Sequence, residues 1–172
     1  MDQSYCDALR FAIEYEQQGE AYYREAAGKT RDLFARKALL FLADEEIEHI
    51  GKIERFNAYL LGTAEFDLDA ECRPTAPEKA AAFIAGAKTE GKTAEAADLS
   101  DLAVYDLAMV TETQGFEMYA SVRDSSGDER LKRFFAWLAD EEVVHYKLLA
   151  GSKKYLEDQS YYFEEAGGWI FG

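Results

Sequence analysis

The stretches LADEEIEHI at residues 42–50 and LADEEVVHY at residues 138–146 are nearly the same nine residues, 96 positions apart. Each places a glutamate three residues before a histidine, and these are the only two histidines in the 172-residue chain. Residues three apart on a helix lie on one face, one above the other. The repeat therefore predicts two helical copies of one Glu/His pair.

The repeat extends beyond these nine residues and indicates a duplicated helical hairpin. At the same offset the aligned pairs are Ala12 with Ala108, Glu16 with Glu112, Gly19 with Gly115, Tyr23 with Tyr119, Leu42 with Leu138, Glu46 with Glu142, and His49 with His145. Two hairpins of one type can pack about an approximate two-fold axis, so that equivalent residues meet near that axis. The duplication thus predicts a site as well as a fold.

Four long segments carry apolar residues at the three- and four-residue spacing of amphipathic helices. They run at about 4–27, 31–61, 100–124 and 128–157. Glycine and helix-capping residues separate the first from the second and the third from the fourth, in GKTRD (28–32) and DSSGDE (124–129). We therefore expect two tight antiparallel hairpins.

The connection between the hairpins, residues 62–99, contains both prolines and an Ala-rich piece at about 77–89 that we expect to form one short helix. A connection this long is uncommon in a compact domain unless it crosses the molecule. It predicts parallel second and third helices, the pattern of a four-helix bundle with one crossover. The expected fold is all-α, with residues 1–172 as a single domain: hairpin one at 4–61, the crossover at 62–99, hairpin two at 100–157 and a tail at 158–172.

The spacing of the acidic residues completes a predicted metal site. Glu16 precedes Glu46 by thirty residues, as Glu112 precedes Glu142, and a hairpin that turns near residue 30 brings such positions to similar height at about 1.5 Å rise per residue. The predicted inward-facing set is Glu16, Glu46, His49, Glu112, Glu142 and His145.

Four carboxylates buried without basic partners would cost several kcal/mol each. Two divalent cations would cancel this charge, and mixed oxygen and imidazole ligation suits iron or manganese better than a closed zinc site. By symmetry, Glu46 and Glu142 are expected to bridge the ions. The same ligand set occurs in ferritin-like di-iron and di-manganese bundles.

Other interpretations of these residues remain open at the level of sequence. One Glu-x-x-His pair alone is weak evidence, and both pairs can be solvated helix faces left over from duplication. The adjacent acidic residues Asp44, Glu45, Asp140 and Glu141 are expected on a solvated face or as hydrogen-bonding partners of the ligands.

Composition limits the partners. The net charge of −15, from 34 acidic and 19 basic residues, disfavours nucleic acid and anionic membrane surfaces and favours cations. The start lacks a basic and then apolar leader, and no stretch approaches 18 apolar residues, so we expect a cytoplasmic protein that does not span a membrane. Cys6 and Cys72 form no Cys-x-x-Cys and are expected to be reduced thiols.

The segments AIEYEQQGEAYY (12–23) and AMVTETQGFEMY (108–119), together with the two ADEE elements, resemble the rubrerythrin family of the ferritin-like superfamily. The resemblance covers both hairpins and implies two iron ions held by the six residues named above. It also implies that Tyr23 and Tyr119 are phenols hydrogen-bonded near the ligand carboxylates. From the residues alone, both tyrosines are expected to be core aromatics with satisfied hydroxyls.

Two departures from the family pattern affect the expected activity. Rubrerythrins proper carry a rubredoxin domain with two Cys-x-x-Cys elements, which this chain lacks, so the reductant is expected to be a separate molecule such as a rubredoxin-like protein. The family has an extra glutamate where this chain has Gly115; His49 is then expected to stay bound in both redox states, with less efficient peroxidase turnover. Glu20 is the nearest substitute, and we expect it to be exposed.

Three functions follow from these features. The first is a peroxidase- or oxidase-type enzyme that reduces hydrogen peroxide or dioxygen; the second is a ferroxidase or iron-handling protein; the third is a non-catalytic, metal-stabilised interaction module. A homodimer is expected by analogy with ferritin-like bundles. The aromatic tail at 158–172 is expected to pack as a strap on the bundle or on a neighbouring subunit, with a lid over the site as the alternative.

Overall fold

The computed structural model describes residues 3–89 and 99–157, and these residues form six α-helices and no strand. The helices are α1 Gln3–Lys29, α2 Leu33–Leu60, α3 Leu68–Glu71, α4 Ala76–Thr89, α5 Leu99–Ser125 and α6 Glu129–Glu157. The predicted all-α fold is confirmed, and the four long helices begin and end within two or three residues of the predicted bounds. The short helix α3 was not predicted, and the tail at 158–172 lies outside the described residues.

Aspartates at equivalent places start the second helix of each hairpin. The side chain of Asp32 accepts a hydrogen bond from the backbone N–H of Ala35 at 2.8 Å, and that of Asp128 accepts one from Arg130 at 2.8 Å. Each satisfies a backbone donor that the first helical turn leaves without an intrahelical partner. The capped turns allow α1 to fold back on α2, and α5 on α6.

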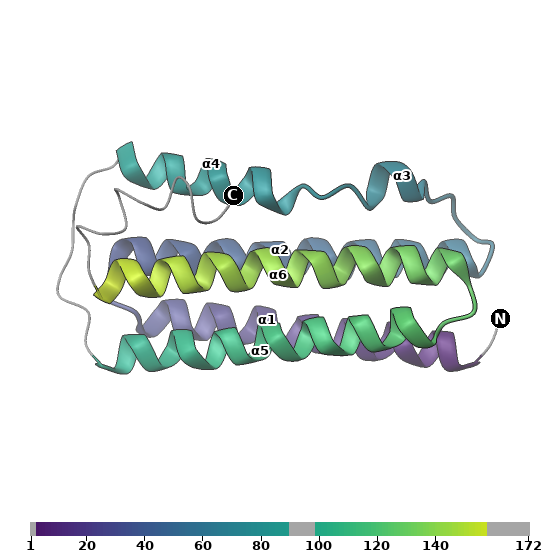
Figure 1. Ribbon diagram of the computed structural model, residues 1–172, viewed down its shortest axis with the longest axis horizontal. Coiled ribbons are helices and arrows are strands. Elements are labelled where there is room, and N and C mark those ends of the chain that lie inside the picture. Colours follow the sequence, from purple (N-terminus) through teal and green to yellow (C-terminus); the bar gives the residue numbers. More distant parts are fainter. Residues whose placement is uncertain (1–2, 90–98, 158–172) are drawn as a thin grey trace.

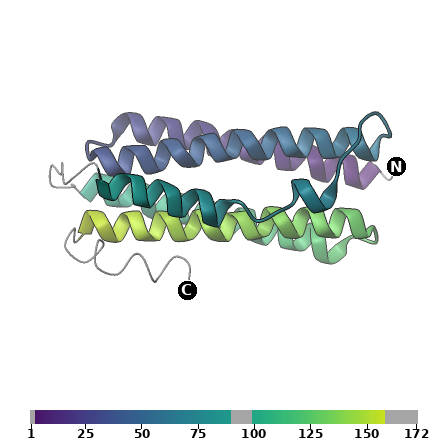
Figure 2. The same cartoon turned by 90° about the horizontal axis from the view of Figure 1, so that it is seen from above.

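The two hairpins lie side by side, and α2 and α5 run in the same direction (Figure 1). The connection between them, which includes α3 and α4, returns along the length of the bundle, as the predicted crossover requires. Seen from above, α4 lies along the seam between the hairpins, where it contacts α6 (Figure 2). No helix in the described ranges has an apolar stretch long enough to cross a membrane.

Two apolar clusters fill the bundle, one toward each end. One contains Tyr23, Leu39, Leu42, Tyr105 and Leu148, and the other contains Leu9, Ile53, Phe56, Tyr119 and Phe134, among others. The rings of Phe56 and Phe134 stack at 4.0 Å. Buried acidic residues and histidines lie along the same four helices, and the apolar clusters keep them away from water.

Candidate metal centre

The structure brings all six predicted ligand residues together in the bundle core. Helix α1 supplies Glu16, α2 supplies Glu46 and His49, α5 supplies Glu112, and α6 supplies Glu142 and His145. Each is at most 2% exposed. The interpretation of these residues as two solvated helix faces is therefore wrong.

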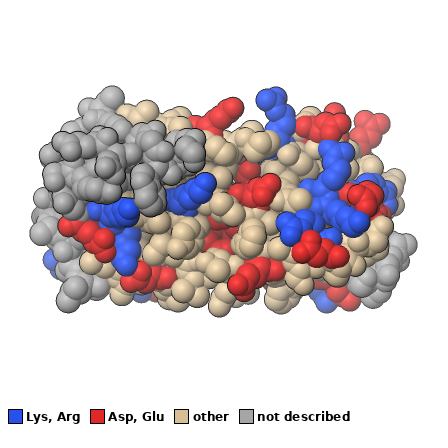
Figure 3. Space-filling model, viewed as in Figure 1, with Lys and Arg blue, Asp and Glu red and all other residues tan. Residues whose placement is uncertain are grey.

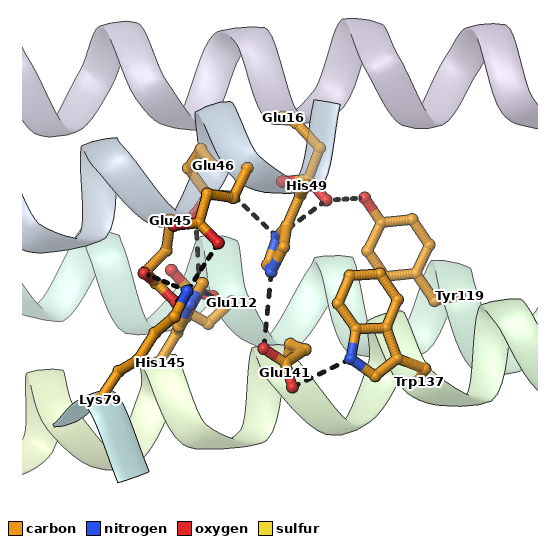
Figure 4. Close-up of polar contacts among 11 residues, drawn as sticks. Glu16, Glu45, Glu46, His49, Lys79, Glu112, Tyr119, Trp137, Glu141 and His145 are labelled. Atoms are coloured by element: carbon orange, nitrogen blue, oxygen red, sulfur yellow. Dashed lines mark hydrogen bonds and ion pairs between the residues drawn. The ribbon is translucent and has the colours of Figure 1, made fainter. Parts of the chain in front are cut away.

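Figure 4 shows that the side chains of five of them converge on one small volume: Glu16, Glu46, His49, Glu112 and His145. Glu46, His49, Glu142 and His145 each offer a ligand atom within 4.8 Å of the others. The Nδ1 atom of His49 lies 3.3 Å from Glu46 and 3.5 Å from Glu16, and the Nδ1 atom of His145 lies 3.6 Å from both Glu46 and Glu112. Glu46 therefore lies between the two imidazoles, where a bridging carboxylate is expected.

Several of these buried atoms lack a hydrogen-bond partner, which tests whether a cation fits. The atoms are Oε2 of Glu46, Oε2 of Glu112, Oε1 of Glu142 and both ring nitrogens of each histidine. A buried polar atom without a partner costs free energy, and native proteins keep few of them. Unpartnered oxygen and imidazole atoms that converge on one volume are a donor set that a divalent cation would satisfy.

The pKa shifts within the group show how strongly its buried members interact. Burial, together with the neighbouring Glu46, raises the pKa of Glu16 to about 8, and burial together with Glu112 raises the pKa of Glu142 well above its usual range. Burial lowers the pKa of His145, but the nearby carboxylates of Glu112 and Glu46 outweigh this and raise the pKa to about 10. The metal-free site therefore holds protons that a bound cation would displace.

The pKa of Glu46 is shifted in the opposite direction from those of Glu16 and Glu142. Burial alone would raise its pKa, but the closeness of Glu16, His145 and His49 outweighs burial and lowers the pKa below its ordinary value. Glu46 thus stays ionised beside the two histidines. This supports its predicted position between two ions.

Each of the two tyrosines donates a hydrogen bond to a glutamate of the other hairpin. Tyr23 donates its hydroxyl to Oε1 of Glu112, and Tyr119 donates its hydroxyl to Oε1 of Glu16. Both side chains are fully buried. Burial and the charge of Glu16 raise the pKa of Tyr119 well above its usual value, so this phenol keeps its proton. Each first-helix glutamate is therefore held by a donor from the opposite hairpin.

The acidic neighbours of the ligands divide into two kinds. Asp44 and Asp140 are exposed, whereas Glu45 and Glu141 are buried. Glu141 accepts a hydrogen bond from Nε1 of Trp137 at 3.1 Å, and its other oxygen lies 3.9 Å from Nε2 of His49. Because Glu141 lies on the Nε2 side of the His49 ring, it favours the orientation in which Nδ1 of His49 faces the other carboxylates.

Glu45 has a different partner, which comes from the crossover. Nζ of Lys79 on α4 donates to both oxygens of Glu45, at 2.9 and 3.1 Å, and to Glu48 at 2.6 Å. Phe41 occupies the position equivalent to Trp137 and has no N–H to donate. The sequence did not predict either partner, because neither Lys79 nor Trp137 is repeated. The one sign of a role for Glu45 and Glu141 was that a glutamate stands four residues before each histidine.

The two aligned glycines lie against the two predicted bridging glutamates. A Cβ atom on Gly19 would lie 3.6 Å from Glu46, an ordinary contact, whereas one on Gly115 would lie 2.9 Å from Oε2 of Glu142 and 3.0 Å from Tyr15. A larger residue at position 115 therefore requires Glu142 or Tyr15 to move. The glycine, in place of the family's additional glutamate, leaves room for the observed position of Glu142.

Glu20, the nearest substitute for that glutamate, is not directed to the centre. It pairs with Arg24 on the same helix, and Arg24 also reaches Asp44 at 3.1 Å. The described structure thus brings four carboxylates and two imidazoles together, without a fifth carboxylate at position 115.

Two duplicated hairpins with a buried Glu/His group between them define a ferritin-like bundle whose core could hold metal. The family model described as Rubrerythrin matches residues 7–153, and the chain belongs to the rubrerythrin family. Among curated proteins and solved structures, none matches the chain significantly.

Proposed function

We propose that this protein is a di-iron, or mixed iron and manganese, oxidoreductase that reduces hydrogen peroxide or dioxygen with electrons from a separate donor. The observation that carries the proposal is the buried convergence of four carboxylates and two imidazoles, several of whose atoms have no hydrogen-bond partner. Such an activity would protect a cell from oxidative stress.

The proposed ligands differ in role. Glu16 with His49 would hold one ion and Glu112 with His145 the other, because these pairs lie within 3.6 Å through Nδ1. Glu46 and Glu142 would bridge the ions. Iron bound by these residues would supply the two electrons that reduction of an O–O bond requires.

The chain's own residues would then handle protons and exclude water. Reduction of one peroxide to two waters consumes two electrons and two protons. Tyr23 and Tyr119 hold protons at the oxygens of Glu112 and Glu16, which places them to donate a hydrogen bond or a proton beside the centre. Because the chain contains no Cys-x-x-Cys element, a separate rubredoxin-like protein is the proposed electron donor.

The decisive experiment combines metal analysis with rapid mixing of the reduced protein. We expect two ions per chain, fast oxidation by peroxide or by dioxygen, and repeated turnover with a chemical reductant. If the reduced protein does not react with either oxidant, it is a metal-stabilised module and the proposed activity is wrong. A size measurement in solution will test the proposed homodimer.

Two pairs of substitutions test the site itself. Glu46→Ala with Glu142→Ala should abolish metal binding, whereas Asp44→Ala with Asp140→Ala, which changes the exposed neighbours, should leave metal content unchanged. Unchanged metal content in the first pair would overturn the assignment of the ligands.

Iron handling is the second candidate function, and the net charge of −15 favours it because an acidic surface attracts ferrous ions. A ferroxidase would oxidise many added ferrous ions per site and react slowly with peroxide. The rapid-mixing experiment distinguishes the two, because reductase activity needs a reductant for turnover and ferroxidase activity needs added ferrous ion.

A further inference from the structure

A cavity of about 200 Å³ lies between α5 and α6, beside the candidate metal centre. Its lining consists of Glu112, Thr113, Phe116, Glu142, Val143 and Tyr146. Glu112 and Glu142 are two of the buried proposed ligands, whereas Phe116, Val143 and Tyr146 are each exposed. The cavity therefore lies between solvent and the two helix positions that carry the proposed carboxylate ligands of hairpin two.

The outer part of this cavity is almost wholly apolar. Phe116, Val143 and Tyr146 present ring and methyl surfaces, and the hydroxyl of Thr113 is already engaged with the carbonyl of Met109 at 2.8 Å. A strongly hydrated molecule would lose hydrogen bonds to water here without replacing them. A small apolar molecule would lose no such hydrogen bonds.

The charge around the cavity disfavours anions. On the face that α5 and α6 present, Lys and Arg side chains lie mainly toward the two ends, and the middle is uncharged or acidic (Figure 3). Two acidic residues, Glu112 and Glu142, are also among the residues that line the cavity. An uncharged oxidant thus fits this path better than an anionic one such as superoxide.

Hairpin one has a different surface at the equivalent place. Glu20 stands where hairpin two has Phe116, and Ile47 stands where it has Val143. The carboxylate of Glu20 pairs with Arg24, and Arg24 continues to Asp44 on α2. An ion-pair bridge between α1 and α2 thus replaces the apolar opening, so the duplication does not preserve two equal paths.

We propose that the cavity between α5 and α6 is the route by which dioxygen reaches the metal centre, with Phe116, Val143 and Tyr146 as the residues that select it. This inference rests on the proposed oxidoreductase function and specifies its oxidant: a small, uncharged, weakly hydrated molecule.

The first test does not depend on activity. Xenon occupies apolar cavities in proteins and resembles dioxygen in its lack of charge and polarity. Crystals of the metal-loaded protein under xenon pressure should show a xenon atom against Phe116, Val143 and Tyr146. Absence of xenon from this cavity would overturn the proposed route.

The second test blocks the cavity and uses the other hairpin as the control. Val143→Trp should slow oxidation of the reduced centre by dioxygen at least 10-fold with unchanged metal content. Ile47→Trp, at the aligned and similarly exposed position of hairpin one, should change the rate less than twofold. Equal effects of both variants, or no effect of Val143→Trp, would overturn the route.

The two proposals fail in different ways. If the reduced wild-type protein is inert toward both oxidants, the proposed function is wrong, and the xenon experiment still decides whether the cavity admits a small apolar molecule. If the protein reacts with dioxygen but Val143→Trp reacts as fast, the function stands and the route is wrong. Val143→Ala should react at least as fast as the wild type; a slower Val143→Ala would also contradict the route.

Discussion

Gly19 and Gly115 occupy equivalent positions in the duplicated hairpins but face different neighbours. At position 19 a methyl group would make an ordinary contact with Glu46, and at position 115 it would overlap Glu142 and Tyr15. The hydroxyl of Tyr15 donates to the carbonyl of Thr111 at 2.5 Å, so its ring is not free to move away. One residue thus affects where a proposed bridging ligand can lie.

These glycines provide a matched pair of substitutions. Gly19→Ala should raise the free energy of unfolding by up to about 1 kcal/mol, because alanine is the better helix former. Gly115→Ala should not raise the free energy of unfolding, because the added methyl group overlaps Glu142 and Tyr15. It should weaken metal binding about 10-fold or more, as when a group that positions a ligand is removed. Chemical denaturation and metal titration of both variants measure this, and equal behaviour would show that Glu142 moves freely.

The tyrosine hydroxyls are a second test at this scale. Tyr119→Phe removes the donor to Glu16 without changing the shape of the core, and we expect about 10-fold weaker metal binding. Tyr105→Phe is the control, because the Tyr105 hydroxyl donates at 3.0 Å to the backbone of Ala35 instead of to a proposed ligand. If both variants bind metal equally well, the phenol contributes nothing to the site.

Much of the site was predictable at this scale, because the repeat places chemically identical residues in register. Both Glu-x-x-His pairs and the upstream glutamates Glu16 and Glu112 came from spacing alone. The burial of Glu45 and Glu141 could not be predicted from spacing, because an acidic residue beside a ligand is solvated unless a hydrogen-bond donor lies within reach. The donors are Lys79 and Trp137, whose positions depend on tertiary packing.

At the level of secondary-structure elements, α4 packs against the bundle next to the candidate metal site. Lys79 joins α4 to Glu45, one residue before Glu46, and Ala80 and Ile84 of α4 are buried. The helix at 77–89 was predictable from its composition. Helix α3 was not, because four residues show no periodicity; it forms where Asp67 accepts hydrogen bonds from the backbone of Asp69 and Ala70.

The ion pair between α4 and α2 should contribute more to stability than a surface pair. Lys79→Ala leaves Glu45, which is 5% exposed, without its cation, and should lower the free energy of unfolding by about 1–3 kcal/mol. Lys153→Ala removes the cation from an exposed carboxylate, Asp106, which water can solvate, and should cost less than about 1 kcal/mol.

A double variant identifies the physical cause of the stability loss expected in Lys79→Ala. Adding Glu45→Gln to Lys79→Ala should restore part of the loss, because a neutral amide is less costly to bury than a carboxylate without a partner. Denaturation of the metal-loaded single and double variants measures the coupling. If the double variant is as unstable as the sum of the single ones, Lys79 acts through packing instead of charge.

The whole molecule combines a strongly acidic surface with a core that concentrates carboxylates and imidazoles. Apolar clusters on the same four helices keep this polar layer dry, so its groups cannot relax by taking up water. The stability of the metal-free protein should then depend on the protons that the layer holds, and that of the loaded protein on the ions that replace them.

This difference predicts opposite pH dependences. In the metal-free protein the pKa of Glu16 is raised from 4.5 to about 8 and that of His145 from 6.5 to about 10, while the pKa values of Glu142 and His49 are raised well above their ordinary values. Between pH 6 and 8.5 the folded state therefore binds more protons than the unfolded state. Its stability should fall with rising pH, by about 1.4 kcal/mol per unit for each proton held in excess.

In the metal-loaded protein the same groups are deprotonated ligands, so the unfolded state binds more protons than the folded state near pH 6. Stability should therefore rise from pH 6 toward neutrality and then level off. Thermal unfolding of both forms between pH 6 and 8.5 measures the two slopes. Glu16→Gln with Glu142→Gln should flatten the slope of the metal-free form, because a neutral amide has no proton to lose. A melting temperature of the metal-free wild type that does not fall over this range would contradict the raised pKa values, and the inference that cations replace protons in the core would fail with them.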